Sequence, residues 1–545
     1  IIYTRRCQRG NETGHGIYKY YVCIRTESSE NMYKKEFLRV KPEEVGLSSR
    51  MLLQMLQELE SCGTQMHGLM IERHGKIALE CWWEPYNSSM AHICHSMGKS
   101  YIGTAVGLAC TQGYLGLQDR MVDLFAEEIA ALNIKPSENM KKLTIEHALM
   151  MANGMSVQPP SGEALLTNYL SSDFDHEPGT RFLYNTTGSC MLGAAVEKAT
   201  GRNVREYLTE EILNKIGVES DKLEWMTFHK NHIHAAPGVA SSTENNLRLG
   251  MLYLQNGQWD GEQLIDPEWI NKATTRRIHT EVINKESHLD NGAGYGYQLW
   301  ICPEKDTFKF AGGHGQDVIM SRTNDLTISV NQSADDGGSR AENEIISKYL
   351  LRPTLPSGAL AEDEEGYRLL CNYISTLKVK KRKSNRIPED LNRWNGIYRV
   401  TSGAFHINTE LRPVDDNNVY TDFYDHEDVN VKEVSIYYKN NMLELVFDDG
   451  TYRTCIHAYL DGELRPVYSK GAIPIYTWTV STAFADAEEL VVETKFLQTC
   501  FWTKLIFSET KDGKYKVQVY KERLHEDNPY IYLEAELVKT EKRTG

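Results

Sequence analysis

The segment His95-Ser96-Met97-Gly98-Lys99-Ser100 carries a hydroxyl and an amine three residues apart. On a helix, side chains at positions i and i+3 lie on the same face, so these two groups can meet across one turn. A serine hydroxyl is a poor nucleophile until a base takes its proton. A lysine can be that base only when it is neutral, and at the ordinary pKa near 10.4 about one lysine in 2,500 is neutral at pH 7. Such a pair therefore needs burial or nearby positive charge to do nucleophilic chemistry.

The surroundings of the pair favour chemistry. Ser-x-x-Lys alone is common and most often marks an ordinary surface helix. Here the pattern predicts a mostly buried helix over residues 96–112, in which Ser96 and Lys99 lie among apolar residues such as Ile102 and Val106. A lysine buried in apolar surroundings needs a partner or a function, because an uncompensated buried charge is costly. The pair is therefore a candidate catalytic site.

Three further segments follow in a definite order: residues 143–154 (LTIEHALMMANG), residues 178–193 (PGTRFLYNTTGSCMLG) and residues 238–254 (GVASSTENNLRLGMLYL). Together with the Ser96 helix they resemble the successive motifs of the penicillin-recognising serine hydrolases. That superfamily includes serine β-lactamases, D-alanyl-D-alanine carboxypeptidases, D-aminopeptidases, β-lactamase-like esterases and 6-aminohexanoate-dimer hydrolases. The resemblance extends over about residues 42–351.

The resemblance implies roles for three residues. Ser96 would be the nucleophile, and Lys99 would be the base that activates it. Tyr184, in the second of these segments, would be the catalytic tyrosine that relays a proton between the nucleophile, the amine and the leaving group. A neighbouring ammonium favours the phenolate form of a tyrosine, so the two groups can act as one proton relay. The alternative for Tyr184 is an ordinary core tyrosine.

The tyrosine motif departs from the family pattern. Many members have Tyr-x-Asn, whereas this chain has Tyr184-Asn185-Thr186. The Thr186 hydroxyl replaces an amide that would hold a substrate carbonyl, which weakens the case for a β-lactamase or a cell-wall peptidase. The pattern resembles more closely the branch of 6-aminohexanoate-dimer hydrolases and esterases. We expect Asn185 and Thr186 among the substrate-binding residues.

The third family motif, Lys-Thr-Gly or His-x-Gly, corresponds to the run FAGGHGQ at residues 310–316. Alignment of residues 311–313 loses the cation, and His314 supplies a polar group one step later. Glycines such as Gly313 let the backbone approach a substrate closely. A backbone N–H near His314, with that of Ser96, would form an oxyanion hole. The alternative is a glycine-rich turn into a strand. Without a cation in this motif, small esters or amides fit better than penicillins.

The remaining candidate sites are weaker. Tyr297, in the run GYGYQLW, is as compatible with a substrate wall as with a core strand. His92 with His95, and a second group of histidines at 229, 232 and 234, have metal-ligand spacing, but neither comes with an HExxH motif or a partnered acidic ligand. No phosphate-binding or dinucleotide loop is apparent. We therefore expect neither a metal nor a cofactor.

The elements expected around the site define two domains. Amphipathic periodicity predicts a helix over residues 48–59, and strands are expected at 68–83 and at 308–331 with helices between them. Strands at both ends of a helical region indicate an α+β body resembling the β-lactamase/transpeptidase fold, an antiparallel sheet flanked by helices. Beyond Trp394, short alternating strands separated by Asp-Gly turns predict an antiparallel barrel or sandwich. Its resemblance to the lipocalin-like appendages of some D-aminopeptidase-type relatives implies the barrel. The expected ranges are an N-terminal extension at 1–39, a catalytic domain at 40–352, a linker at 353–390 and the barrel at 391–545.

Composition excludes several classes of protein. The 545 residues are 41% hydrophobic and 25% charged, which is typical of globular domains, and the net charge of −15 argues against nucleic acid as a partner. The most apolar stretch is too short and too polar for a membrane span. Eleven cysteines, an odd number with no CxxC pair, indicate reduced thiols. With no visible leader, a cytoplasmic location is expected, although the true N-terminus is uncertain because the first Met is Met32.

The sequence therefore predicts a serine hydrolase that acts through an acyl-enzyme on small esters or amides, with a small-molecule substrate as its partner. The alternatives are a β-lactamase or D-aminopeptidase-type peptidase, a non-hydrolytic acyl-binding sensor on the same fold, and a binding or structural protein in which the site has decayed. A homodimer remains open.

Overall fold

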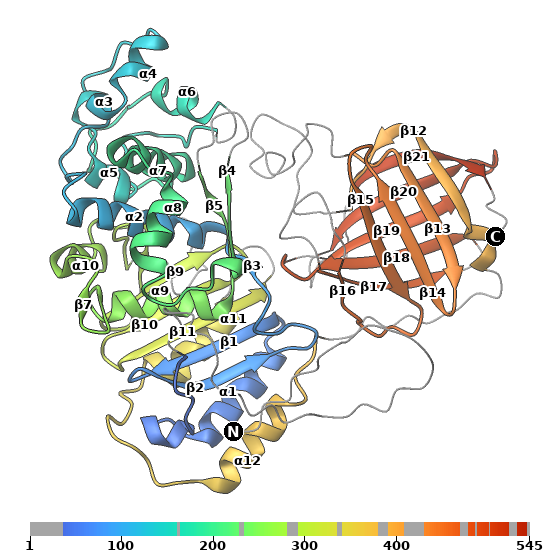
Figure 1. Cartoon of the computed structure of the whole chain (residues 1–545), viewed down its shortest axis with the longest axis horizontal. Coiled ribbons are helices and arrows are strands. Elements are labelled where there is room, and N and C mark those ends of the chain that lie inside the picture. Colours follow the sequence, from blue (N-terminus) through green and yellow to red (C-terminus); the bar gives the residue numbers. More distant parts are fainter. Residues whose placement is uncertain are drawn as a thin grey trace.

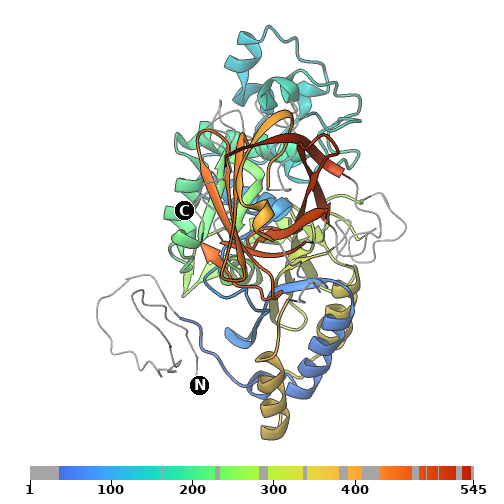
Figure 2. The same cartoon turned by 90° about the vertical axis from the view of Figure 1, so that its right-hand side faces the viewer.

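The computed structural model describes residues 36–160, 164–227, 234–280, 293–334, 340–379, 391–407, 430–468, 478–485, 488–500, 502–522 and 531–541. Figure 1 shows a mixed body of helices and sheet together with a barrel. Figure 2, turned by 90°, shows the barrel in front of the middle of that body. The barrel therefore lies over the middle of the mixed body.

An antiparallel sheet is the centre of the mixed body. Among the described residues its six strands are β1 (Gln65–Arg73), β2 (Lys76–Trp82), β8 (Trp300–Ile301), β9 (Thr307–Gly312), β10 (Gln316–Ser321) and β11 (Leu326–Ser333). Their order is β2-β1-β11-β10-β9-β8. Because β1 pairs with β11, the first and last parts of this domain meet in the middle of the sheet. β10 and β11 are buried along their whole length, because helices cover both faces.

Helices pack on both faces of this sheet (Figure 1). The described helices are α1 (Ser49–Ser61), α2 (Gly98–Thr111), α3 (Met121–Leu124), α4 (Ala126–Ala131), α5 (Ile145–Leu149), α6 (Leu165–Leu170), α7 (Thr186–Thr200), α8 (Val204–Leu208), α9 (Thr243–Leu254), α10 (Pro267–Ala273), α11 (Arg340–Ile346) and α12 (Glu364–Ile374). One face is covered by α1, α11 and α12, and the other by α9 with α2 above it. Gly250 of α9 lies so close to β10 and β11 that an added Cβ would be 2.5 Å from Val318 Cγ1. This close packing fixes α9 on the sheet.

Short elements connect these layers. A small sheet contains β3 (His92–Ile93), β4 (Leu223–Thr227) and β5 (His234–Ser241), and a hairpin pairs β6 (Gln258–Trp259) with β7 (Glu262–Gln263). Single 3-10 turns are η1 (Pro42–Val45), η2 (His95–Met97), η3 (Met140–Lys142), η5 (Ser220–Lys222) and η8 (Leu391–Trp394), and π turns are η4 (Thr209–Leu213) and η7 (Ser347–Leu351).

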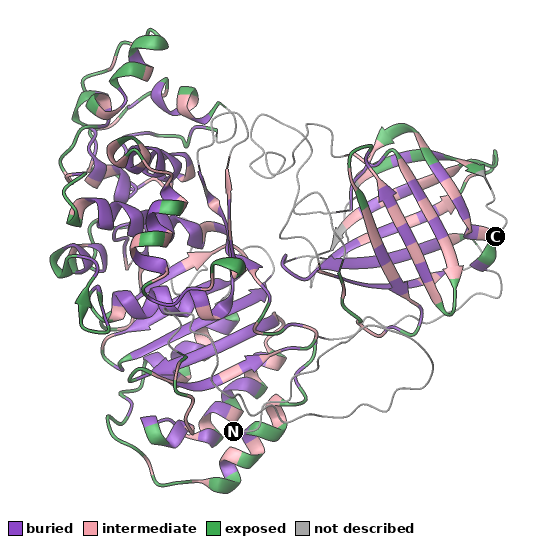
Figure 3. Cartoon of the chain, viewed as in Figure 1, coloured by how far each residue is buried: buried purple, intermediate pink, exposed green. Residues whose placement is uncertain are grey.

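The C-terminal strands form a closed antiparallel barrel. Its strands are β12 (Gly396–Ala404), β13 (Glu433–Lys439), β14 (Met442–Asp448), β15 (Arg453–Tyr459), β17 (Trp478–Ala485), β18 (Glu489–Phe496), β19 (Trp502–Glu509), β20 (Tyr515–Glu522) and β21 (Ile531–Glu541). A parallel pairing of β15 with β17 closes the circle of these nine strands, and β16 (Val467–Tyr468) adds to β17. Inward and outward residues alternate along β14 (Figure 3). Gly450, Gly462 and Gly513 of the predicted turns have positive φ, which glycine adopts without strain.

The predicted fold class is confirmed, and α1, β1, β2, β9, β10 and β11 lie where the periodicity places them. The range expected to be a linker, 353–390, includes one described helix. It contains α12, which packs against α1 and is joined to it by the ion pair of Arg50 with Asp363. The hydrophobic periodicity of α12 on one face explains this packing. The predicted N-terminal extension up to residue 35 and residues 380–390 lie outside the described residues.

The barrel and the mixed body share apolar contacts. Ile93 and Ala240 of the body belong to the barrel's buried cluster. In return, Val480, Leu497 and Trp502 of the barrel pack in the cluster between the sheet and α1. The two domains are therefore held together by buried side chains. None of the described helices combines the length and apolar character that crossing a membrane requires.

Candidate active site

Ser96 and Lys99 lie at the start of the central helix. Ser96 is in η2, and Lys99 is in the first turn of α2. The Lys99 Nζ donates a hydrogen bond of 2.9 Å to the Ser96 Oγ. Lys99 is only 1% exposed, whereas Ser96 is half-buried and can be reached from outside. The hydroxyl and the amine thus meet across one turn, as their spacing predicts.

The backbone around Ser96 is tightly constrained. His95 has a φ of 48°, in the left-handed region that non-glycine residues adopt only at a cost. Gly98 lies against β5, so close that an added Cβ would be 2.1 Å from the carbonyl oxygen of Ala236. The strained turn and the close approach of β5 together fix the direction of the Ser96 side chain.

Tyr184 lies beside the amine of Lys99. The Nζ is 4.8 Å from the centroid of the Tyr184 ring. Tyr184 precedes α7, whose first turn is capped by Asn185: its side-chain oxygen accepts a hydrogen bond from the Gly188 N–H at 2.8 Å. The tyrosine ring also stacks on Trp300 of β8, with centroids 5.8 Å apart. The helix cap and the stack fix Tyr184 against the Ser-Lys pair.

The glycine-rich turn between β9 and β10 runs beside the nucleophile segment. An added Cβ on Gly312 would be 2.0 Å from the Cys94 carbonyl oxygen, and one on Gly313 would be 3.8 Å from the Cβ of His95. The rings of His314 and His95 lie 5.3 Å apart in an edge-to-face arrangement. The His314 Nδ1 is 3.1 Å from the Ala334 carbonyl oxygen. The structure thus brings Gly313 and His314 next to the turn that carries Ser96.

The other predicted substrate residues lie in different surroundings. Asn185 is fully buried as a helix cap. Thr186 is half-buried, and its N–H donates to the Gln158 side-chain oxygen at 2.8 Å. Tyr297 is fully buried, and its hydroxyl donates to Glu146 of α5. These contacts of Tyr297 fit the alternative of a core residue.

The barrel supplies a contact that the sequence did not predict. In the turn between β18 and β19, the Cys500 Sγ lies 3.4 Å from the His95 Nε2, and the Gln498 carbonyl accepts the N–H of Ile93 at 2.8 Å. The Gln316 side chain also reaches the Cys500 Sγ, at 3.6 Å. Trp300 ends the aromatic run for which the sequence left a substrate wall and a core strand equally open, but its stack on Tyr184 was not predicted. No local pattern near residue 500 points to the Ser-Lys helix.

The thiols and the second phenol next to Ser96 and Tyr184 keep their protons near pH 7, so they do not act as alternative nucleophiles or bases. Burial raises the pKa of the Cys94 thiol to about 12 and that of the Cys190 thiol to about 11, so both stay neutral near pH 7. Burial also raises the pKa of Tyr295, which packs against Tyr184, well above its ordinary value. Tyr295 therefore keeps its proton, and Tyr184 is the half-buried phenol of the two.

Of the histidines that the sequence offered as metal ligands, the described ones contact other side chains of the protein. The His92 Nε2 is 2.9 Å from the His67 Nδ1, and the His234 Nδ1 is 3.2 Å from the Glu197 carboxylate. Histidines 229 and 232 lie outside the described residues. The nine described cysteines form no disulfide.

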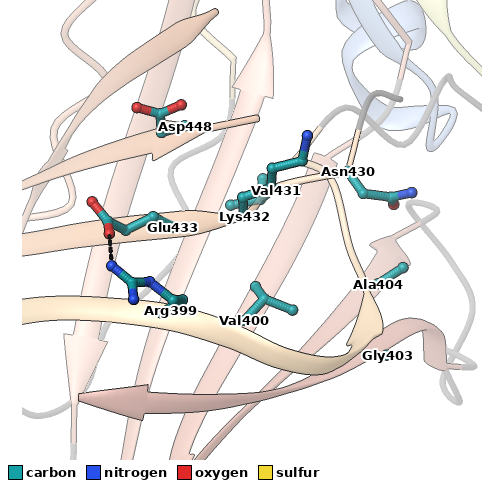
Figure 4. Close-up of a pocket in the computed structure, with 9 residues that line it drawn as sticks. All are labelled: Arg399, Val400, Gly403, Ala404, Asn430, Val431, Lys432, Glu433 and Asp448. Atoms are coloured by element: carbon teal, nitrogen blue, oxygen red, sulfur yellow. Dashed lines mark ion pairs between the residues drawn. The ribbon is translucent and has the colours of Figure 1, made fainter. Parts of the chain in front are cut away.

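A surface pocket of about 550 Å³ lies on the barrel between β12, β13 and β14 (Figure 4). An ion pair of 3.7 Å between Arg399 and Glu433 lies along it. None of the predicted catalytic residues lines this pocket. It is therefore separate from the candidate active site.

A family model named Beta-lactamase matches residues 57–349, just over half of the chain. Three solved structures match the chain at low similarity. A Bacillus anthracis protein named as a putative 6-aminohexanoate-dimer hydrolase is 18% identical, over 58% of this chain and 86% of its own, with a TM-score of 0.44. An octameric penicillin-binding protein homologue from Pyrococcus abyssi is 16% identical, over 90% and 99%, with a TM-score of 0.44. A penicillin-binding protein homologue from Caulobacter crescentus is 15% identical, over 58% and 98%, with a TM-score of 0.46. With its four motifs in order and a family model that spans them, this chain belongs to the beta-lactamase family, within the penicillin-recognising serine hydrolases that its motifs resemble.

Proposed function

We propose that this member of the family hydrolyses small esters or amides through an acyl-enzyme on Ser96. One observation carries the proposal. The buried Lys99 amine lies 2.9 Å from the Ser96 hydroxyl oxygen and 4.8 Å from the centre of the Tyr184 ring. A nucleophile, a base and a phenol thus meet at one point, which is the arrangement that serine acylation needs.

The reaction uses these groups in two halves. In the first, Lys99 acts as the general base and takes the Ser96 proton while Oγ attacks the substrate carbonyl carbon. Collapse of the tetrahedral intermediate breaks the bond to the leaving alcohol or amine, which takes that proton through Tyr184. In the second, a water molecule gives its proton to the same relay and attacks the acyl carbon. Ser96 leaves as a free hydroxyl, and the carboxylic acid is released.

The developing oxyanion needs donors in fixed positions. We assign them to the backbone N–H of Ser96 and to an N–H of the turn at Gly313 and His314. The support is the contact of this turn with the nucleophile segment: an added Cβ on Gly312 would collide with the Cys94 carbonyl. Removing one such donor typically costs about 10² to 10³ in kcat in other enzymes.

The glycine-rich motif at residues 310–316 contains no lysine or arginine, which favours uncharged substrates over penicillins. Penicillins carry a carboxylate, which a cationic side chain on this strand would recognise. Lys309 is the lysine of β9, but it is 1% exposed and its Nζ is 3.5 Å from a carboxylate oxygen of the equally buried Asp317. The Lys309 charge is thus paired with Asp317 inside the domain and does not face a substrate. In addition, Thr186 stands where many relatives have an amide.

The proposal is tested with p-nitrophenyl butyrate and nitrocefin, assayed side by side on the full chain. We expect steady turnover of the ester at a higher kcat/KM than that of the lactam. Ser96→Ala and Lys99→Met should each lower kcat by roughly 10³-fold or more without unfolding the protein. Exposed Ser89→Ala is the matched control and should match the wild type.

Each contrary outcome has a definite meaning. A single stoichiometric burst without turnover would identify a non-hydrolytic acyl-binding sensor. Faster hydrolysis of nitrocefin, or of D-amino-acid amides, would identify a β-lactamase or a D-aminopeptidase-type peptidase. No labelling of Ser96 by a fluorophosphonate probe would mean that the site has no nucleophile.

A further inference from the structure

Three side chains with metal-binding atoms gather on the outer face of the barrel, away from the candidate active site. Glu444 of β14 and His457 of β15 are direct cross-strand partners. Cys455 lies two residues before His457, so both project from the same face of β15. On both strands the neighbouring residues Leu445 and Ile456 are buried, and the three residues themselves are half-buried. The register therefore places a carboxylate, an imidazole and a thiol together near solvent.

Two of the three distances between these atoms match those between ligands of one ion. The Cys455 Sγ is 3.7 Å from the His457 Nε2, and that same nitrogen is 3.4 Å from a Glu444 carboxylate oxygen. All three ligand atoms lie within 4.8 Å of one another. Ordinary zinc–ligand lengths and a tetrahedral angle place sulfur and nitrogen ligands about 3.6 Å apart, and nitrogen and oxygen ligands about 3.4 Å apart. These two separations thus require almost no movement of the side chains.

We propose that Glu444, Cys455 and His457 form a Zn²⁺ site on the barrel, with water in the fourth position. A mixed set of sulfur, nitrogen and oxygen donors suits Zn²⁺, while Mg²⁺ and Ca²⁺ prefer oxygen ligands alone. The ion would join β14 to β15 by bonds additional to the ladder between them. The site involves none of the proposed catalytic residues, so it does not rest on the proposed function.

A hydrogen-bonded cluster without a metal is the competing explanation for the same distances. Burial and the Glu444 charge raise the pKa of the Cys455 thiol above its ordinary range, so the thiol keeps its proton until a cation replaces it. A metal replaces this proton because only the thiolate is a strong ligand. A direct binding measurement therefore separates the two explanations.

The test uses the full chain, stripped with a chelator, and the metal ions alone as probes. Titration with Zn²⁺ against a chromophoric chelator gives the stoichiometry and the affinity. Titration with Co²⁺ reports sulfur ligation through the near-ultraviolet charge-transfer band of a cobalt thiolate. The variants are Cys455→Ser, His457→Ala and Glu444→Gln. The matched controls are Cys371→Ser, at an exposed thiol on α12, and Glu433→Gln, on the neighbouring strand β13.

We expect the wild type and both controls to bind one equivalent of Zn²⁺ that Cys455→Ser and His457→Ala lose. Glu444→Gln should weaken binding by about tenfold or more, since even outer-shell partners of a metal are worth 10- to 100-fold. The cobalt thiolate band should disappear in Cys455→Ser and persist in Cys371→Ser. A wild type without this equivalent, or the same affinity and band in Cys455→Ser, would overturn the proposal. Retained ester hydrolysis or an unchanged unfolding temperature would show that the variants are folded.

Discussion

The Cys500 Sγ of the barrel lies 3.4 Å from the Nε2 of His95, the residue directly before the proposed nucleophile. The turn that carries Cys500 also holds Ile93 through the carbonyl of Gln498. Two polar contacts thus join the barrel to the segment that ends in Ser96. The barrel is a structural neighbour of the candidate active site.

Lys495 holds this turn in place and provides the first prediction. Its Nζ, which is buried, donates to Gln65, Ser333 and the Cys500 carbonyl at 2.9 to 3.2 Å. It also lies 3.2 Å from the Nε2 of His67, whose pKa burial lowers well below its ordinary value, so that the ring is a neutral acceptor. Lys495→Met removes these hydrogen bonds, and a hydrogen bond to a charged group is worth about 1.5 to 3 kcal/mol.

We therefore expect Lys495→Met to lower the unfolding free energy by at least about 2 kcal/mol. We also expect kcat for the ester to fall more than tenfold, with a smaller change in KM, because the Ser96 segment loses its support. Urea unfolding and steady-state kinetics measure the two effects. Lys504→Met, at a half-buried lysine of β19, is the control. Equal kinetics in the two variants would mean that the barrel turn does not position the site.

Gly312 provides the second prediction, because it is the point where β9 meets the nucleophile segment. An added Cβ would lie 2.0 Å from the Cys94 carbonyl oxygen, a backbone atom that cannot rotate away. Gly312→Ala should therefore move the glycine-rich turn away from Ser96 and lower kcat about 10²-fold or more, as the loss of an oxyanion donor does. Gly358→Ala, where nothing lies within 4 Å of the added Cβ, should match the wild type. Full activity of Gly312→Ala would exclude this turn from the oxyanion hole.

The stack of Trp300 on Tyr184 provides the third prediction. The two rings lie 17° from parallel, with centroids 5.8 Å apart, so Trp300 limits where the phenol can move. Trp300→Leu removes the flat partner, and we expect kcat to fall about tenfold, since small displacements of catalytic groups are costly. Trp300→Phe keeps an aromatic face and should restore most of the activity. If both variants behave alike, the stack does not position Tyr184.

Glu72 provides the fourth prediction, on pH and stability. Burial raises its pKa from 4.5 to about 7. The folded chain therefore holds this proton more tightly than the unfolded chain does. The contribution to stability is complete below about pH 4.5 and is lost as the pH rises through about 7, a change of up to ~3 kcal/mol.

Glu72→Gln cannot ionise, so it should be more stable than the wild type at pH 8 by up to ~3 kcal/mol, and the difference should shrink at pH 5. Thermal unfolding followed at both pH values measures this difference. Glu127→Gln, at an exposed position on α4, is the control and should show no such dependence. A pH-independent difference for Glu72→Gln would contradict the assignment.

Local geometry explains which parts of this protein could be predicted. The meeting of Ser96 and Lys99 follows from their spacing, because one helical turn brings positions i and i+3 together whatever surrounds them. The antiparallel strands of the C-terminal domain follow from short alternating segments and Asp-Gly turns for the same local reason, whereas the pairing of β15 with β17 that closes them into a barrel does not. Helix α12, inside the range expected to be a linker, was not predicted, because a short amphipathic helix forms only where another helix, here α1, covers its apolar face.

Contacts between distant segments are decided by the tertiary structure alone. The sequence assigned Tyr184 only through a family resemblance, and nothing in its local pattern showed that its ring would lie against Lys99. The contact of Cys500 with His95 joins residues 405 positions apart, and Glu444 reaches His457 only through the register of β14 on β15. Backbone geometry determines which neighbours along the chain share a face, so the sequence carries that information directly. Which distant segments meet depends on how all the apolar faces are buried at once, and only the folded chain decides that.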